Sequence, residues 1–458
     1  MSIIATRIRS LLLSGGAAFL PAALSLPAVG ATLCVNPAGS GGCYATIQSA
    51  VNAAHAYDVI KVGPGTYQEG VVIGIPLSLL GAGAQQSTID ATNQGNGVLV
   101  DGFDHAGLRS VVVAGFTVEN AQWEGVLVVS ATDVTIRDNR VINNDAAGPV
   151  FTGLPGGCPG QPAYETDESG DCGGAVHLIG SSTSIVSGNY MTGNADGILI
   201  SDETASSRDN LITGNAVIDN PLDCGIVLAS HPPIGSSAPN FAPHYGVIHN
   251  TVSGNVSVGN GVQVGGAGVG LFSDGNGPGR VSETEVINNT LIHNGIGGVS
   301  LHSHVGPAFG APADNMDNNT IIGNYIAKNL ADTFDTATPG PVGININSGG
   351  GGSPVTGTVI AFNTIEDEDF DIAINTPAQV DVHFNNLLSG KAGLGGNTGV
   401  GNVCAYDSAT ICTGVIDAGQ NYWGCPGGPA AGGTCGSTYG GSIIFTPWLT
   451  QPVSGKQN

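Results

Sequence analysis

Histidine and aspartate residues that end short apolar runs are the residues of this chain most able to do chemistry. His302 and His304 end "GVSLHSH", His231 ends "GIVLASH", and Asp274 ends "GVGLFSD". Histidine titrates near neutral pH and binds transition metals, and carboxylates transfer protons or bind cations. Acid–base catalysis and metal binding are therefore the chemistries to consider, and both require that these runs lie side by side.

The runs belong to a repeat, which predicts a stacked fold. Between them, asparagines recur five residues apart around apolar residues, as in "NTVSGN" and "NTLIHN". Short strands separated by sharp bends give this pattern, with asparagine adopting the left-handed backbone and bonding to its neighbours in the stack. A helical period of 3.6 residues is absent. Coils of three short strands bury their apolar faces by stacking, so the sequence predicts one elongated parallel β-solenoid.

Both ends of the chain resemble a known family. The opening "TIQSAVNAAHAYDVIKVGPGTYQEGVVIGIPLSLLGAG" (46–83) and the closing "NYWGCPGGPAAGGTCGSTYGGSIIFTPWL" (421–449) resemble the pectate-lyase-like right-handed parallel β-helix superfamily. The resemblance implies an all-β, right-handed parallel β-helix with an N-terminal amphipathic helix cap, whose apolar face is Ile47, Ala50, Val51 and Ala54. It also implies a disulfide-stapled C-terminal cap, which we expect Trp423, Phe445 and Trp448 to fill.

The N-terminus and the cysteines predict an exported protein. Arg7 and Arg9 precede an apolar stretch and the small residues "VGA", which is typical of a signal peptide. We expect a signal peptide at 1–31, the β-helix at 32–403 and a capping segment at 404–458, with no transmembrane segment after signal removal. The location is then secreted, periplasmic or cell surface. Close spacing predicts four disulfides, with Cys224 left as a buried thiol: Cys34–Cys43, Cys158–Cys172, Cys404–Cys412 and Cys425–Cys435.

Net charge restricts the possible partners. The chain has 35 acidic residues against 11 basic ones, a formal net charge of −24, and 74 glycines. Such a surface repels nucleic acid, and it repels anionic polysaccharides unless a cation intervenes. Carbohydrate or a cell-surface glycan is the expected partner, with no cofactor required.

Aligning the coils on their glycines predicts which side chains share a face. Residues two and four positions after each glycine point away from the core, because side chains alternate along a strand. This predicts a substrate-binding strip of Phe272, His302, Asn345 and Asn347, which His177 joins from the shifted run "GAVHLIG" at 174. Six positions after the glycine, His231, Asp274 and His304 form a rim, which Asp202 joins by a one-residue shift, with adjacent coils about 4.8 Å apart.

The rim column allows three interpretations. In the first, it is a solvated stack of aspartate and histidine with a purely structural role. In the second, it processes a glycan: Asp202 and Asp274 lie about 9.6 Å apart by backbone spacing. This is near the upper limit for the acid and base of an inverting glycosidase, about 9.5 Å. His231 lies between them and modulates both. In the third, His231, Asp274, His302 and His304 bind a metal, an arrangement that resembles β-helix accessory proteins of periplasmic copper-enzyme maturation.

Known enzyme motifs of the superfamily are missing. The "QDTL" and "DFIFG" stretches of pectin methylesterases, the "GHG" and "RIK" of polygalacturonases and the "DPHD" of uronan epimerases do not occur. We therefore expect a protein that binds, or processes by hydrolysis or elimination, a polysaccharide in a groove on one sheet. A non-catalytic surface or matrix protein is the alternative. "IEDEDFD" (365–371) predicts a solvated turn or a calcium site at Asp367 and Asp369.

Overall fold

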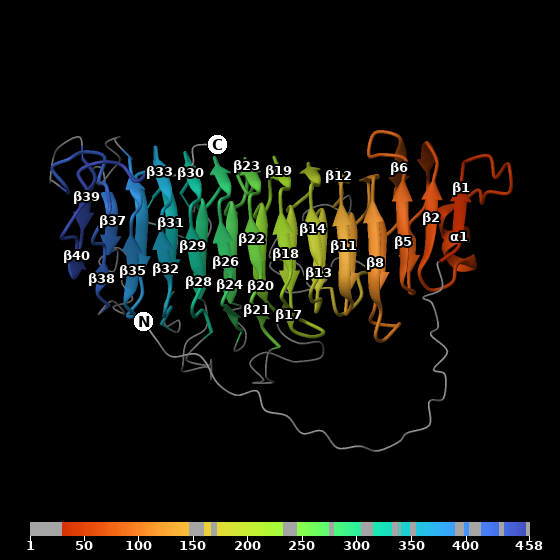
Figure 1. The fold of residues 1–458 in the computed structure, drawn as a ribbon, viewed down its shortest axis with the longest axis horizontal. Helices are drawn as coiled ribbons and strands as arrows, with labels where there is room; N and C mark the ends of the chain where they lie inside the picture. Colours follow the sequence, from red (N-terminus) through yellow and green to blue (C-terminus); the bar gives the residue numbers. More distant parts are fainter. Residues whose placement is uncertain are drawn as a thin grey trace, which may run out of the picture.

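The chain coils into three long parallel sheets that run along one elongated body (Figure 1). The computed structural model describes residues 30–145, 160–165, 172–231, 245–273, 279–303, 315–331, 338, 340–348, 354–389, 398–402, 414–429 and 435–454. Cys404, Cys412, Asp274 and His304 lie outside these residues, as do Cys158 and residues 1–29. Every strand pairing between coils is parallel, so each coil buries its apolar residues against the next.

Sheet A forms the face seen in Figure 1. In order across the sheet its strands are β1 (Thr32–Val35), β2 (Asp58–Val62), β5 (Leu77–Gly81), β8 (Arg109–Ala114), β11 (Thr132–Arg137), β14 (Ile185–Ser187), β18 (Leu211–Thr213), β22 (Thr251–Ser253), β26 (Glu285–Ile287), β29 (Thr320–Ile322), β32 (Val359–Ala361), β35 (Val380–His383), β38 (Ile416–Asp417) and β40 (Ile443–Ile444). Three short strands precede sheet A strands in the middle coils and pair with one another: β17 (Ser207–Arg208), β21 (Val247–Ile248) and β25 (Val281–Ser282).

Sheet B follows sheet A in each coil after a sharp bend. Its strands are β3 (Gly65–Tyr67), β6 (Ser87–Asp90), β9 (Thr117–Glu119), β12 (Arg140–Ile142), β15 (Tyr190–Thr192), β19 (Ala216–Ile218), β23 (Val256–Val258), β27 (Thr290–Ile292), β30 (Tyr325–Ala327), β33 (Thr364–Glu366) and β36 (Asn386–Leu387).

Sheet C contains the glycine-led runs singled out above. Its strands are β4 (Val71–Ile73), β7 (Val98–Asp101), β10 (Val126–Val129), β13 (Val176–Ile179), β16 (Ile198–Ser201), β20 (Ile226–Ser230), β24 (Val269–Ser273), β28 (Val299–Ser303), β31 (Val342–Asn347), β34 (Phe370–Asn375), β37 (Thr398–Asn402) and β39 (Ser437–Tyr439).

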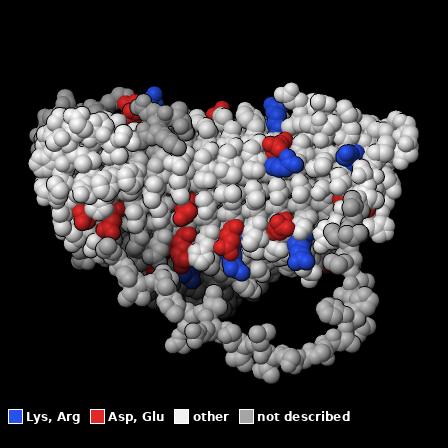
Figure 2. All heavy atoms as spheres, in the orientation of Figure 1, with Lys and Arg blue, Asp and Glu red and all other residues white. Residues whose placement is uncertain are grey.

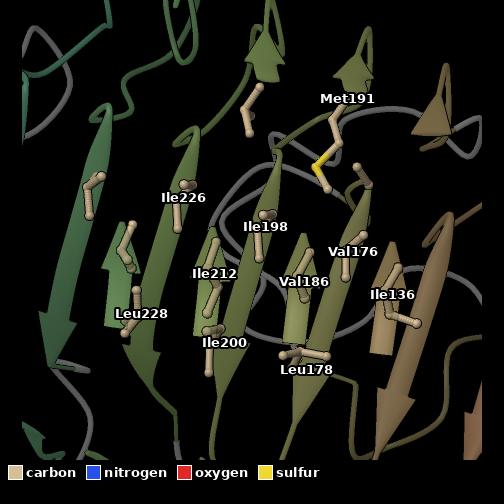
Figure 3. Packing of buried hydrophobic residues seen from close by; sticks show 14 of the residues in the cluster. Ile136, Val176, Leu178, Val186, Met191, Ile198, Ile200, Ile212, Ile226 and Leu228 are labelled. Carbon is tan, nitrogen blue, oxygen red and sulfur yellow. The ribbon is translucent and has the colours of Figure 1, made fainter. Parts of the chain in front are cut away.

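Aliphatic side chains from all three sheets fill the interior (Figure 3). Val176 and Leu178 of β13 meet Val186 of β14 and Met191 of β15, and all four are fully buried. The next coil repeats the arrangement with Ile198, Ile200 and Ile212, so the core is a continuous apolar column. Because β-branched residues suit strands and pack well across coils, this column accounts for the valine- and isoleucine-rich runs.

Asparagine ladders stabilise the bends before and after sheet B. The backbone N–H and Nδ2 of Asn139 donate to Asn189 Oδ1 at 3.0 and 3.1 Å, and the same pair of bonds recurs from coil to coil. One ladder comprises Asn139, Asn189, Asn215, Asn255, Asn289, Asn324, Asn363, Asn385 and Asn421; the other comprises Asn144, Asn194, Asn220, Asn260, Asn294 and Asn329, and ends on Glu368.

The expected stacking is confirmed, but the expected backbone conformation is wrong by one residue. Positive φ falls on the residue before the ladder asparagine, such as Asp138 (56°) before Asn139 and Asn288 (55°) before Asn289. A ladder asparagine must turn its side chain inward to the next coil, so its predecessor makes the left-handed bend.

Helix α1 (Ile47–Ala53) lies at the N-terminal end of the solenoid, beside β1 (Figure 1). It buries Ile47, Ala50 and Val51, three of the four residues predicted for its apolar face. Glu69, from the "GPGTYQE" turn, accepts the Ile47 and Gln48 N–H groups at 2.8 and 2.9 Å. A carboxylate at this position satisfies two orphan donors of the first turn and complements the helix dipole.

Replacing Glu69 with alanine should lower the free energy of unfolding by roughly 1–2 kcal/mol, because two charge-assisted bonds to the helix terminus are lost. Urea denaturation followed by circular dichroism measures this change. Glu285→Ala, at an exposed position of β26, is the control, and an equal loss in both variants would show that Glu69 does not stabilise the helix.

Two of the predicted disulfides join described residues. Cys34 and Cys43 are bonded at the N-terminal end, and Cys425 and Cys435 at the C-terminal end. The remaining two predicted pairs include cysteines outside the described residues. Cys224 is buried, as predicted, and its Sγ accepts the Ala267 N–H.

The aromatic residues of the C-terminal segment divide into two groups. Trp423 is fully buried in the core and Phe445 packs against it, as expected for a plug. Trp448 remains 36% exposed and donates its indole N–H to Pro426 O, so its expected burial is wrong. The bond to the carbonyl holds the ring at the surface, where its polar edge is satisfied.

Charged side chains are sparse on the face of sheet A (Figure 2). Basic and acidic side chains lie next to each other in several places, as Arg137 does with Asp138 at 2.5 Å and Arg208 with Asp209 at 3.2 Å. The described residues of this face therefore form no basic patch of the kind that attracts nucleic acid. Among the described residues, no helix combines the length and the apolar composition of a membrane span.

Candidate functional site

The strand register confirms the predicted alignment of the glycine-led runs. His177, Val227, Gly270, Ser300 and Asn345 lie in one outward column of sheet C. The second outward column contains Ala229, Phe272, His302 and Asn347. Glycine sets the phase of the regular runs, the run at 174 is shifted by one residue, and the two-residue period of a strand then sets which side chains point outward.

The outer face of sheet C is nevertheless not the open strip that the alternation predicted. His177 and Asn345 are 0% exposed, and His302 and Asn347 are each 5% exposed. Part of the cover is apolar: Cys224 and Ala267, from turns beside the sheet, pack on Val227 and Ala229. Phe272 is half-buried against this cluster. The alternation along a strand shows which side chains point away from the core. Whether those side chains reach solvent depends on the apolar residues that pack over the sheet.

A chain of hydrogen bonds crosses this covered face from β10 toward β20. His177 Nδ1 lies 3.1 Å from Glu124 Oε1, and its Nε2 lies 2.7 Å from Ser201 Oγ. Ser201 Oγ donates to Glu203 Oε2 at 2.5 Å, and Glu203 Oε1 lies 2.6 Å from His231 Nδ1. The chain thus begins with a carboxylate and a histidine, passes through Ser201, and ends with a second carboxylate and a second histidine. Such a buried network orients its members strongly because every partner is fixed by the next.

Asp202 lies beside this chain and is fully buried. Its Oδ1 accepts the His231 N–H at 2.8 Å, and its Oδ2 accepts Ser230 Oγ at 3.0 Å and the Gly246 N–H at 2.5 Å. The contact between Asp202 and His231 follows the predicted rim. The expected solvation is wrong, since Asp202 is 0% and His231 only 7% exposed. Asp202 therefore positions the backbone that holds His231.

The pKa values of the two neighbouring carboxyl groups shift in opposite directions. Burial, together with the charge of Glu203, raises the pKa of Asp202 to about 7. Burial also disfavours the charged form of Glu203, but the charge and hydrogen bond of His231 outweigh it, so the pKa of Glu203 is lowered. Glu203 is thus a carboxylate at neutral pH, while Asp202 changes protonation there. Pairs with pKa values separated in this way are typical of acid–base sites.

The remaining strip residues form a second polar group farther along sheet C. The rings of Phe272 and His302 lie edge to face, with centroids 6.4 Å apart. Asn345 Nδ2 donates to Ser300 Oγ at 3.2 Å, and Asn375 Nδ2 donates to Asn347 Oδ1 at 3.2 Å. The predicted partners Asp274 and His304 lie outside the described residues, so their pairing with Asp202 and His231 stays a prediction.

Sequence reasoning missed Glu124 and Glu203. Glu203 directly follows Asp202 in "SDETAS", so its proximity to the rim was visible in the sequence. Glu203 lies six positions after Gly197, the position of the rim itself, but the one-residue shift that placed Asp202 in the rim passed over it. Glu124 immediately precedes the glycine of "GVLVVS", where no polar pattern recurs. Only its contact with His177, from the next coil, reveals it.

The acidic stretch at 365–371 is not the solvated turn that was expected. Glu368 (1% exposed) and Asp371 (0% exposed) point inward, whereas Asp367 and Asp369 are half-buried. Asp367 adopts positive φ (59°), and calcium binding there stays a prediction. Glu368 Oε1 accepts both N–H groups of the last asparagine in its ladder, Asn329, at 3.0 and 2.8 Å. Glutamate therefore replaces asparagine at the end of the ladder.

Comparison with known proteins identifies the fold. Residues 83–310 match the family model described as "Right handed beta helix region". The protein is a right-handed parallel β-helix. Comparison with curated protein sequences gives no match.

The solved structures similar to this β-helix include a glucanase, a viral protein and an epimerase module. The catalytic unit of the GH87 α-1,3-glucanase from Streptomyces thermodiastaticus strain HF3-3 has 15% identity and a TM-score of 0.52 over 88% of this chain and 65% of that one. Geobacillus virus E2 ORF18 has 15% identity and a TM-score of 0.48 over 70% and 53%. The AlgE6 mannuronan C-5 epimerase A-module from Azotobacter vinelandii has 15% identity and a TM-score of 0.44 over 88% and 94%. The β-helix thus spans about half of the viral protein and 65% of the glucanase unit.

Proposed function

We propose that this β-helix is an exported protein that binds a neutral polysaccharide along the outer side of sheet C and transfers protons at His231. The observation that carries the proposal is the Glu203–His231 pair, with Nδ1 and Oε1 2.6 Å apart beside a carboxyl group of opposite pKa shift. A carboxylate bonded to one imidazole nitrogen fixes the tautomer and orientation of the ring and stabilises its protonated form. His231 would be the proton-transfer group, Glu203 its orienting partner, and Asp202 a positioning group.

Composition and fold favour a neutral polysaccharide as the ligand. A solenoid presents equivalent positions in successive coils, which suits an extended chain of repeating units. Phe272, which is only half-buried on this otherwise covered face, supplies a ring for stacking on sugar. The net charge of −24 disfavours polyanions. A glucanase catalytic unit shares the fold, and its substrate class is the first to test. The disulfides support export, and the proposal requires no cofactor.

The test is a panel of neutral and acidic polysaccharides, including α-1,3-glucan, assayed for binding by affinity electrophoresis and for products by release of new chain ends. We expect a neutral polysaccharide in the gel to retard the wild-type protein, and we expect the protein to degrade that polysaccharide. His231→Gln should lose at least about 100-fold in turnover while it retains binding, since general acid–base groups contribute about 10²–10⁴. His55→Gln is the matched control, because the side chain of His55 is 93% exposed near the N-terminal end of the solenoid, away from His231.

The outcomes separate binding from catalysis. Binding without products would refute the catalytic assignment and leave a non-catalytic glycan-binding protein. Turnover that survives His231→Gln would move catalysis to other residues, with Asp274 and His304 the next to replace. If no polysaccharide is retarded, the carbohydrate proposal is wrong, and a structural role of the solenoid becomes the better account.

A further inference from the structure

A group of three metal-ligating side chains lies on sheet A, near the C-terminal end and away from the polar chain of sheet C. Asp381 and His383 belong to β35, and Asp417 belongs to β38. Asp381 and Asp417 are register partners in adjacent strands. Since His383 follows Asp381 by two residues, it points to the same side. One potential ligand atom from each residue lies within 4.8 Å of the others.

A hydrogen bond outside the group fixes the tautomer of His383. Its Nδ1 lies 2.9 Å from Gly419 O, and a carbonyl oxygen only accepts, so Nδ1 carries the proton. In the neutral ring Nε2 then has the free lone pair. A bond from the second ring nitrogen to a backbone carbonyl is the arrangement that orients histidine ligands in metal sites.

Distances within the group suit a bridging ion better than a direct contact. His383 Nε2 and Asp417 Oδ2 are 4.0 Å apart, which is too long for a hydrogen bond. An ion at about 2.0–2.2 Å from each ligand atom fits between them. Among the described residues, no lysine or arginine forms an ion pair with Asp381 or Asp417, so neither carboxylate is neutralised by a fixed cation.

We propose that Asp381, His383 and Asp417 form a binding site for a divalent transition metal, with zinc as the best representative. One imidazole and two carboxylates match the ligand preferences of zinc, and the partly exposed position leaves room for water as a further ligand. The ion would cross-link β35 and β38, whose partner residues are 36 positions apart in sequence, and thereby stabilise the final coils. This inference is independent of the function proposed for sheet C.

A second histidine provides a matched control. His249 also lies between two carboxylates, with Nδ1 3.9 Å from Asp209 Oδ1, but its Nε2 is hydrogen-bonded directly to Glu283. In the described part of the chain, only the Asp381 group brings three ligand atoms within 4.8 Å of one another. His249→Gln should therefore leave zinc binding unchanged.

The experiment titrates the chelator-treated full-length protein with zinc against a fluorescent indicator and repeats the titration with cobalt, whose visible absorption reports its ligands. We expect one site in wild type, at least tenfold weaker binding in His383→Gln and Asp417→Asn, and a zinc-dependent rise in Tm that both variants lose. Circular dichroism in the absence of metal checks that each variant folds.

Several results would overturn the proposal. One is a wild-type protein that binds no zinc, and another is a His383→Gln variant that binds zinc as tightly as wild type does. A loss of binding in His249→Gln alone would place the ion at the other histidine. Calcium binding with the same affinity as zinc would exclude a transition-metal site, because a site selective for zinc depends on the imidazole ligand.

Discussion

Replacing Asn289 with alanine should lower the free energy of unfolding by about 4 kcal/mol, because it leaves buried donors without acceptors. Asn289 Oδ1 accepts the backbone N–H and Nδ2 of Asn255 at 2.9 and 3.0 Å. Its own Nδ2 donates to Val252 O and to Asn324 Oδ1. Alanine removes all four bonds at a position that is 1% exposed. Thermal and urea unfolding, followed by circular dichroism, measure the loss.

Asn52→Ala is the control for this prediction. Asn52 also accepts a side-chain hydrogen bond, from Gln48 Nε2 at 2.8 Å, but it lies on the exposed side of α1. We expect a change of no more than about 0.5 kcal/mol, because water replaces the lost partner. Hydrogen exchange should show the Asn289→Ala effect concentrated in β23 and β27, since each coil contacts only its neighbours. If both variants unfold alike, the ladder contributes no more than an exposed bond.

The β-helix should be more stable in mild acid than in mild alkali, because the buried carboxyl group of Glu368, at the end of the asparagine ladder that contains Asn329, holds a proton. Burial raises the pKa of Glu368 to about 8, although the bonds from Asn329 oppose the shift. Burial also raises the pKa of Asp371 well above its ordinary value. The folded chain therefore holds protons that the unfolded chain releases. Stability is highest below about pH 4.5 as far as these groups are concerned, and it falls as pH rises toward 8.

Glu368→Gln should remove much of this pH dependence. Its carbonyl oxygen still accepts from Asn329, and its amide does not ionise, so the free energy of unfolding at pH 8 should rise by on the order of 3 kcal/mol. Urea denaturation at pH 5 and pH 8 measures both quantities. Glu285→Gln, on the exposed face of β26, should change neither. A Glu368→Gln variant that is less stable than wild type at pH 8 would mean that the carboxylate itself is required.

The sequence predicted the architecture well because the repeat encodes it locally. Glycine set the phase of the regular runs in sheet C, and the two-residue period then placed Ser300 and Asn345 in one column. Asparagine at the bends predicted the ladders. Disulfide spacing predicted Cys34–Cys43 and Cys425–Cys435. Each of these inferences requires only one coil and its immediate neighbours.

Burial and the polar partners could not be predicted in the same way. Whether His177 reaches solvent depends on Cys224, Ala267 and other residues that pack over the sheet, and strand alternation carries no information about them. Glu124 and Asp417 are also outside the repeat pattern, and they meet their partners only when coils stack. The acidic stretch shows the same limit: Glu368 continues a ladder of asparagines, and this becomes visible only when Asn329 is placed above it.

The asparagine ladders also restrict how such a protein can change its length. Each side-chain amide donates to the amide oxygen of the next coil, always in the same direction along the molecule. Inserting or deleting part of a coil would put another residue at a ladder position, so that a donor in the row would lose its acceptor. Inserting or deleting a complete coil leaves every amide donor opposite an acceptor. Lineages of this protein should therefore gain and lose complete coils, and Glu368, whose carboxyl group has no amide N–H to continue the row, marks a natural stopping point for one row.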